Sequence, residues 1–185
     1  MRRAAALALC LVTCATLASC DLPADGPIRG WADVSRTCFP PESVPDFRHS
    51  ALGFPLPEDL PPGVRIETVE LVNPDGITIG TSSLIPVYQD AEGVWLTLGL
   101  EPFPPTENFP AEWEQAVPAI GDPVPTDAPK TLVVELRLDD GRDRGSVDGV
   151  RITYTVNGRH YQAVSTAGAG LGTCENDEST DEESV

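Results

Sequence analysis

Positive charge is scarce in this sequence. Lysine and arginine together number 12 against 29 acidic residues, which gives a formal net charge of −17 at pH 7, and Lys130 is the only lysine. Binding to nucleic acid, or electrostatic binding to anionic lipid head groups, needs patches of lysine and arginine. The composition therefore argues against a nucleic-acid partner and against membrane binding through charge alone.

Long apolar runs are absent beyond the N-terminus. The one such run, residues 4–17, is short and rich in alanine and threonine, whereas a membrane-spanning helix needs roughly 20 apolar residues. No second run of that length follows, so we expect no transmembrane helix.

Residues that carry catalysis are also few. Histidine occurs twice, as His49 and His160, and the Gly-x-Ser-x-Gly elbow of serine hydrolases is missing. Asp46, His49 and Ser50 are neighbours in sequence, but geometry rather than proximity along the chain defines a catalytic triad. There is no His-x-His motif or methionine cluster for zinc or copper. We predict a protein that is not an enzyme, with no catalytic, cofactor-binding or metal-binding residues and with both histidines solvated.

The acidic segment 139–149 has a composition typical of calcium loops. Its acids do not fall on the alternate positions of an EF-hand, and Arg142 and Arg144 offset their charge. We therefore predict a solvated, glycine-rich connection between two strands.

The N-terminus has the layout of an export signal. Arg2 and Arg3 precede the apolar run, and Leu17-Ala18-Ser19-Cys20 ends it. This segment resembles the lipobox of bacterial lipoproteins. The resemblance implies that residues 1–19 are removed, that Cys20 carries diacylglycerol, and that the protein is lipid-anchored at the extracytoplasmic face of the cell membrane. An ordinary signal peptide with an incidental cysteine, or an uncleaved signal anchor, is the alternative.

The cysteines divide between export and folding. Cys10 and Cys14 leave with the signal peptide, and Cys20 takes the lipid in the lipoprotein interpretation. Cys38 and Cys174 remain, and an exported pair in an oxidising compartment is typical of a disulfide. A redox-active or metal-binding pair would usually be spaced as Cys-x-x-Cys, so we favour a structural disulfide between Cys38 and Cys174.

Four segments have the apolar periodicity of strands: 64–72, 77–84, 94–100 and 132–138. In the first, the apolar positions change parity, which predicts a bulge near Glu67 and Thr68. Asn-Pro-Asp-Gly at 73–76 predicts a turn that reverses the chain into the second strand.

The strand at 132–138 alternates most regularly, with Glu135 and Arg137 pointing outward. Its inward-facing residues are Leu132, Val134, Leu136 and Leu138.

Prolines break up two long segments, 39–63 and 101–130. Their density excludes a long helix or a central strand from the first segment. In the second, one or two helical turns are predicted at 111–117, with Pro110 at the first helical position.

A β-hairpin is predicted at the C-terminal end of the domain. Residues 150–156 alternate apolar and polar side chains, and Asn157-Gly158 suits a two-residue type I′ turn. That register pairs Tyr154 with Tyr161 on the inward face and places His160 opposite Thr155.

Many short strands separated by turns predict an all-β fold, a single antiparallel β-sandwich with long proline-rich loops. An immunoglobulin-like topology is the first candidate, although the cysteine and tryptophan signature of that fold is not matched. The expected organisation is a signal peptide (1–19), a tether (20–30), the sandwich (31–174) and an acidic disordered tail (175–185).

Three aromatic residues lie among the prolines of the second long segment: Phe103, Phe109 and Trp113. They either form an exposed surface for a partner or pin the loop onto the domain, and the second role is the commoner one.

Two functions remain open. The first is a lipid-anchored extracytoplasmic binding or accessory module for a protein or cell-wall partner; the alternative is a small extracytoplasmic hydrolase that uses acidic residues.

Overall fold

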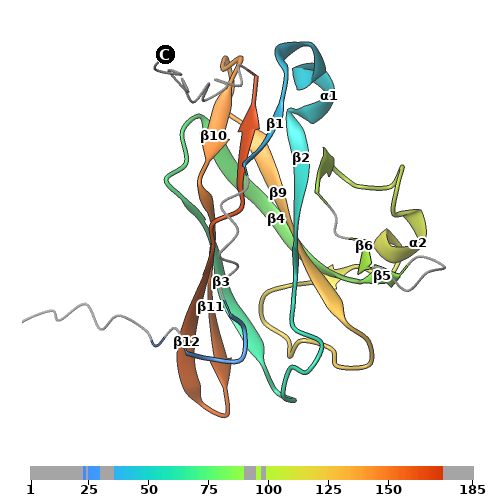
Figure 1. Ribbon diagram of the computed structural model, residues 1–185, viewed down its shortest axis with the longest axis vertical. Helices are drawn as coiled ribbons and strands as arrows, with labels where there is room; N and C mark the ends of the chain where they lie inside the picture. Colours follow the sequence, from blue (N-terminus) through green and yellow to red (C-terminus); the bar gives the residue numbers. More distant parts are fainter. Residues whose placement is uncertain (1–22, 24, 30–35, 90–94, 97–98, 173–185) are drawn as a thin grey trace, which may run out of the picture.

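The computed structural model describes residues 23, 25–29, 36–89, 95–96 and 99–172 (Figure 1). This part of the chain has an all-β, sandwich-like fold, which confirms the predicted fold class. An immunoglobulin-like topology stays a prediction. The predicted signal peptide and acidic tail lie outside the described residues.

A five-stranded antiparallel sheet forms one layer of the fold. Its strands, in spatial order, are β7 (Leu100–Pro102), β2 (His49–Pro55), β9 (Lys130–Leu138), β4 (Ile77–Pro86) and β8 (Val117–Pro118).

A three-stranded antiparallel sheet forms the opposing layer (Figure 1). Its strands are β12 (Arg159–Ser165), β11 (Gly149–Val156) and β3 (Arg65–Val72). Two smaller sheets complete the fold: β1 (Arg36–Phe39) with β13 (Gly168–Leu171) and β10 (Gly145–Val147), and β5 (Tyr88–Gln89) with β6 (Trp95–Leu96).

Two details of the small sheets differ from the sequence prediction. Strands β1 and β13 pair in parallel, so the sandwich is not wholly antiparallel. Strand β10 lies inside the segment 139–149, which was predicted to be a solvated, glycine-rich connection between two strands. In the rest of that segment, the Arg142 guanidinium forms an ion pair with Asp75 at 2.9 Å.

The helices are short. A 3₁₀ turn, η1 (Pro41–Ser43), leads into α1 (Val44–Phe47), and α2 (Pro110–Trp113) begins at the predicted proline. The predicted helix extended to Val117, but that residue begins β8 instead. None of the helices in the described chain has the length and apolar character needed to cross a bilayer.

The predicted hairpin is confirmed. Asn157 and Gly158 have φ angles of 51° and 77°, the positive values that a type I′ turn requires. Tyr154 pairs with Tyr161, their rings stack with centroids 5.6 Å apart, and His160 lies opposite Thr155.

The predicted bulge in the first strand is also confirmed. Thr153 pairs with Thr68 while the next residue, Tyr154, pairs with Ile66, which leaves Glu67 as the extra residue of β3. The turn at 73–76 leads into β4 as expected, but β3 and β4 belong to different sheets. This turn therefore carries the chain from one layer of the sandwich to the other.

The prediction that prolines exclude a central strand from 39–63 is wrong. Strand β2 lies between β7 and β9 in the five-stranded sheet. It occupies the proline-free window after Pro45, and its only proline, Pro55, is the last residue of the strand. The predicted strand at 94–100 is represented by the short strands β6 and β7, and Val94 and residues 97–98 lie outside the described residues.

One hydrophobic core joins the two layers. Leu132, Val134, Leu136 and Leu138 all point into it, as predicted from their alternation. Ile28 also belongs to this core and is fully buried, so the prediction that residues 20–30 form a tether is wrong for this residue.

Cys38 is disulfide-bonded, and its partner lies outside the described residues. We predict that the partner is Cys174, so non-reducing peptide mapping of the mature protein should recover a single Cys38–Cys174 peptide. In the chain-entropy model a bridge that closes so long a loop stabilises the fold by up to about 5 kcal/mol. Recovery of two freely alkylated thiols, or of a Cys38–Cys20 peptide, would contradict this pairing.

Candidate functional site

The outer face of the five-stranded sheet carries the candidate site. Because side chains alternate along a strand, the odd-numbered residues of β9 point away from the core. Val133 lies beneath the loop that contains α2, and Glu135 and Arg137 continue the same row along the strand. His49 stands beside Arg137 on the neighbouring strand β2.

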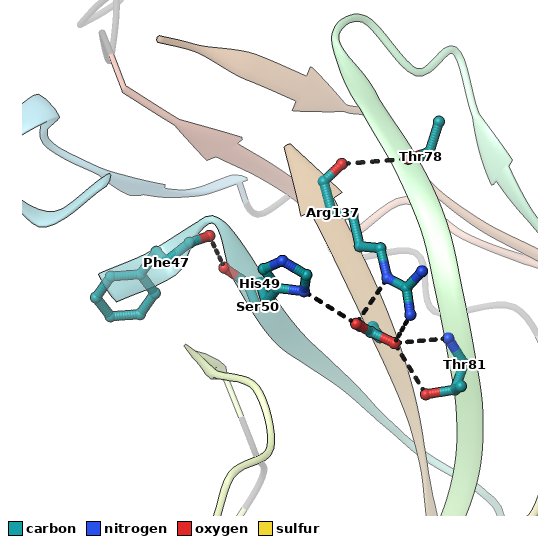
Figure 2. A network of polar contacts seen from close by, with 7 residues as sticks. Phe47, His49, Ser50, Thr78, Thr81 and Arg137 are labelled. Carbon is teal, nitrogen blue, oxygen red and sulfur yellow. Dashed lines mark hydrogen bonds and ion pairs between the residues drawn. The ribbon is translucent and has the colours of Figure 1, made fainter. Parts of the chain in front are cut away.

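Glu135 is the centre of a polar network whose other members, His49, Thr81 and Arg137, are labelled in Figure 2. Its carboxylate accepts hydrogen bonds from Arg137 Nε at 2.8 Å and Arg137 Nη2 at 3.0 Å. It also accepts bonds from the Thr81 backbone N–H at 2.8 Å and the Thr81 hydroxyl at 3.0 Å. The His49 ring contributes a third side, with Nδ1 3.2 Å from Oε1. The carboxylate is therefore surrounded by partners from three neighbouring strands, β2, β4 and β9.

A bulge in β4 builds one side of this network. Ile79 pairs with Leu136 and Ser82 with Val134, so Gly80 and Thr81 together oppose Glu135. The irregularity directs the Thr81 N–H onto the carboxylate. A Cβ at Gly80 would collide with the Glu135 carboxylate and lie 2.7 Å from Arg137 Nε. Glycine at this position thus leaves the space that the charged pair occupies.

The network fixes the charge of Glu135. Burial alone would raise the pKa of this carboxyl group, but the hydrogen bonds from Arg137, Thr81 and His49 outweigh that effect. The pKa falls from its usual 4.5 to about 2. Glu135 is therefore ionised at neutral pH and has no proton to donate as a general acid.

The alternation of residues 132–138 predicts the direction of the Glu135 side chain but not its burial. The side chain points outward, yet it is only 3 % exposed, whereas Arg137 and His49 are 47 % and 60 % exposed. The network thus presents an arginine and a histidine to solvent on top of a buried carboxylate. No local signal identifies this site, because the bulge and His49 come from separate parts of the chain.

Asp46, His49 and Ser50, which are neighbours in sequence, do not come together as a triad. His49 and Ser50 are adjacent on β2 and therefore point to opposite faces of the sheet. Ser50 is buried on the core side, where its hydroxyl donates to the Phe47 carbonyl at 2.5 Å (Figure 2). Asp46 is exposed on α1.

The three aromatic residues of the proline-rich loop cover the other half of the same face. Phe103, Phe109 and Trp113 are half-buried, and the rings of Phe103 and Trp113 meet edge to face at 5.3 Å. They pack on a small apolar cluster on the outer side of the sheet, formed by Ala51, Ile85 and Val133. This packing supports their role as anchors of the loop, and each of the three residues remains partly exposed.

The second histidine lies on the opposite layer. His160 Nδ1 is 3.0 Å from a Glu67 carboxylate oxygen, and both side chains are partly exposed. No group of three or more potential metal ligands occurs among the described residues. Cys20 and Cys174 lie outside that part of the chain.

Comparison with known proteins gave no match: no family model, curated protein or solved structure matches this chain.

Replacing Glu135 should reveal its contribution to stability. A lowered native pKa means that this carboxylate stabilises the fold fully above about pH 4.5 and progressively less as the pH falls toward 2. Glu135→Gln should therefore lower the free energy of unfolding at pH 7 by up to about 3 kcal/mol, and the difference should shrink in acid. Denaturant unfolding measured across this pH range tests the expectation.

Glu114→Gln is the matched control, because Glu114 is an exposed glutamate directly after α2 in the proline-rich loop. It removes one negative charge without touching the network. The assigned charge would be contradicted if the free energies of unfolding of Glu135→Gln and of the native protein differed by the same amount at pH 7 and at pH 2.

Proposed function

We propose that this protein is a lipid-anchored extracytoplasmic binding or accessory module, held to the membrane through Cys20 and directed toward a protein or cell-wall partner. The observation that carries the proposal is the Glu135 network on the outer sheet face. It fixes one arginine and one histidine in defined positions at the surface, next to a half-buried aromatic cluster.

Such a surface suits recognition. Arginine and aromatic residues are enriched at protein interfaces, and side chains already held in place lose less conformational freedom on binding. Arg137 is held by two parallel bonds to one carboxylate, a geometry that restrains its planar group. His49 is held through Nδ1, which leaves its other ring nitrogen for a partner.

The alternative, a small hydrolase that uses acidic residues, finds less support. Glu135 is the one buried carboxylate among the described residues, and its low pKa opposes proton donation. Catalysis by a serine would need a base within hydrogen-bonding reach, and Ser50 lies on the other side of the sheet from His49.

The anchoring rests on the lipobox-like residues 17–20. In a bacterial host, the native protein should incorporate labelled fatty acid and partition into the detergent phase. Cys20→Ala should abolish both, because the alkylated thiol is removed. An equal detergent-phase fraction for the variant would show that the anchor is elsewhere.

The choice between binding and hydrolysis can be tested with a panel of ester, peptide, glycoside and phosphate substrates. We expect no turnover by the soluble domain expressed without residues 1–20. The variants His49→Ala and Glu135→Gln distinguish a hydrolase from a binding module. A turnover in the parent protein that either variant abolishes, with its circular dichroism spectrum unchanged, would establish the hydrolase.

A further inference from the structure

The segment before β1 is built into the domain rather than loosely attached to it. We call residues 23 and 25–29 the strap. Within it, Ile28 is fully buried in the core. The Ile28 N–H donates to the Tyr154 hydroxyl at 3.1 Å, and that hydroxyl donates to the Ile28 carbonyl, also at 3.1 Å. One buried phenol thus satisfies both backbone groups of the residue, as buried polar groups require.

Two further contacts hold the strap against the hairpin of β11 and β12. Gly26 is buried where a Cβ would collide with the Tyr154 hydroxyl and come within 2.7 Å of the Tyr161 ring. The Gln162 N–H donates to the Pro23 carbonyl at 2.9 Å. The strap is therefore fixed at Pro23, Gly26 and Ile28, and it lies beside β12 (Figure 1).

The distance from the strap to the proposed anchor is short. Cys20 and Pro23 are three residues apart, so a fully extended chain between them spans about 11 Å at most. A lipid on Cys20 would therefore bring Pro23, and the strand that binds it, within about 11 Å of the bilayer surface.

From these contacts we infer that the strap holds the domain in one orientation, with strand β12 beside the lipid surface. This inference rests on the proposed anchoring through Cys20. The loop with α2 lies on the opposite side of the molecule from β12 (Figure 1). The outer face of the five-stranded sheet, with the Glu135 network and the aromatic cluster, is consequently turned away from the membrane.

The charge distribution fits this orientation. Residues 149–172, which include the hairpin, contain no acidic residue in a chain that has 29. The basic side chains of the hairpin are Arg151, Arg159 and His160. On the neighbouring strand β3, Glu70 pairs with Arg151 and Glu67 pairs with His160. The strap adds exposed Asp25 and exposed Arg29, so the charges on this side are of mixed sign. Anionic head groups therefore meet less repulsion here than they would at a wholly acidic surface.

Two insertions distinguish an attached strap from a free tether. One places about ten glycine and serine residues between Leu22 and Pro23, before the strap, and the other places the same residues between Arg29 and Gly30, after it. If the strap is attached, only the first insertion lengthens the connection between lipid and domain. If residues 20–35 acted as one free tether, both insertions would have the same effect.

The measurement is energy transfer to an acceptor on lipid head groups. Protein beginning at Cys20, with its disulfide intact, is coupled through the Cys20 thiol to a maleimide lipid in phosphatidylcholine vesicles. A donor dye is attached through an unnatural amino acid at exposed Arg159 on β12, or at exposed Glu107 in the loop before α2. We expect stronger transfer from position 159 than from position 107.

The insertion before the strap should abolish the difference between the two dye positions, and the insertion after it should preserve the difference. Equal transfer from both positions in the uninserted protein, or an equal effect of the two insertions, would overturn the inference. Chemical coupling bypasses lipidation in cells. A protein that fails to incorporate fatty acid but shows the expected transfer would therefore refute the proposed anchoring and leave the attached strap established.

Hydrogen exchange gives a second readout that needs no membrane. The Ile28 amide should be protected in the native protein, and Gly26→Ala should remove that protection because its Cβ displaces the strap from the tyrosine pair. Gly99→Ala is the control, since a Cβ at Gly99 meets nothing within 4 Å. A native Ile28 amide that exchanges as fast as an unfolded one would contradict attachment.

Discussion

Nearly every residue of strand β9 is buried, and one of them is the charged Glu135. The burial of the outer face of β9 therefore depends on the Glu135 carboxylate having a partner on every side. Burying an unpaired charge is costly, so Glu135 is stable inside the sheet only with its ion pair and hydrogen bonds in place. The bulge in β4, the glycine within it and the position of His49 on β2 all serve that requirement. The local structure of β4 and the position of His49 on β2 therefore both accommodate Glu135 of β9.

The sequence predicts the parts of this fold that depend on neighbouring residues. The hairpin follows from Asn157-Gly158, the bulge at Glu67 from a change of apolar parity, and the core face of β9 from its alternation. The network around Glu135 is different, because Thr81 and His49 are distant in sequence and each is an ordinary polar residue. Only the pairing of β2 and β4 with β9 brings them to the carboxylate.

The missed strand β2 shows a related limit. The prolines of segment 39–63 lie near its two ends, so their overall density says little about its middle. The proline-free residues 46–54 are long enough for a strand, and β2 forms there. Ile28 was assigned to a tether because a single isoleucine among polar and small residues has no periodicity to indicate burial. Its place in the core is set by Tyr154, which lies far along the chain.

The contact between Ile28 and Tyr154 also moves the boundary of the folding unit. A domain excised at residue 31, where the sandwich was predicted to begin, would lose a fully buried side chain and leave a hole in its core. It would also leave the Tyr154 hydroxyl in an apolar site without its two backbone partners. The smallest piece of this chain that keeps its core intact therefore starts at the strap, only a few residues after the predicted lipid-bearing cysteine.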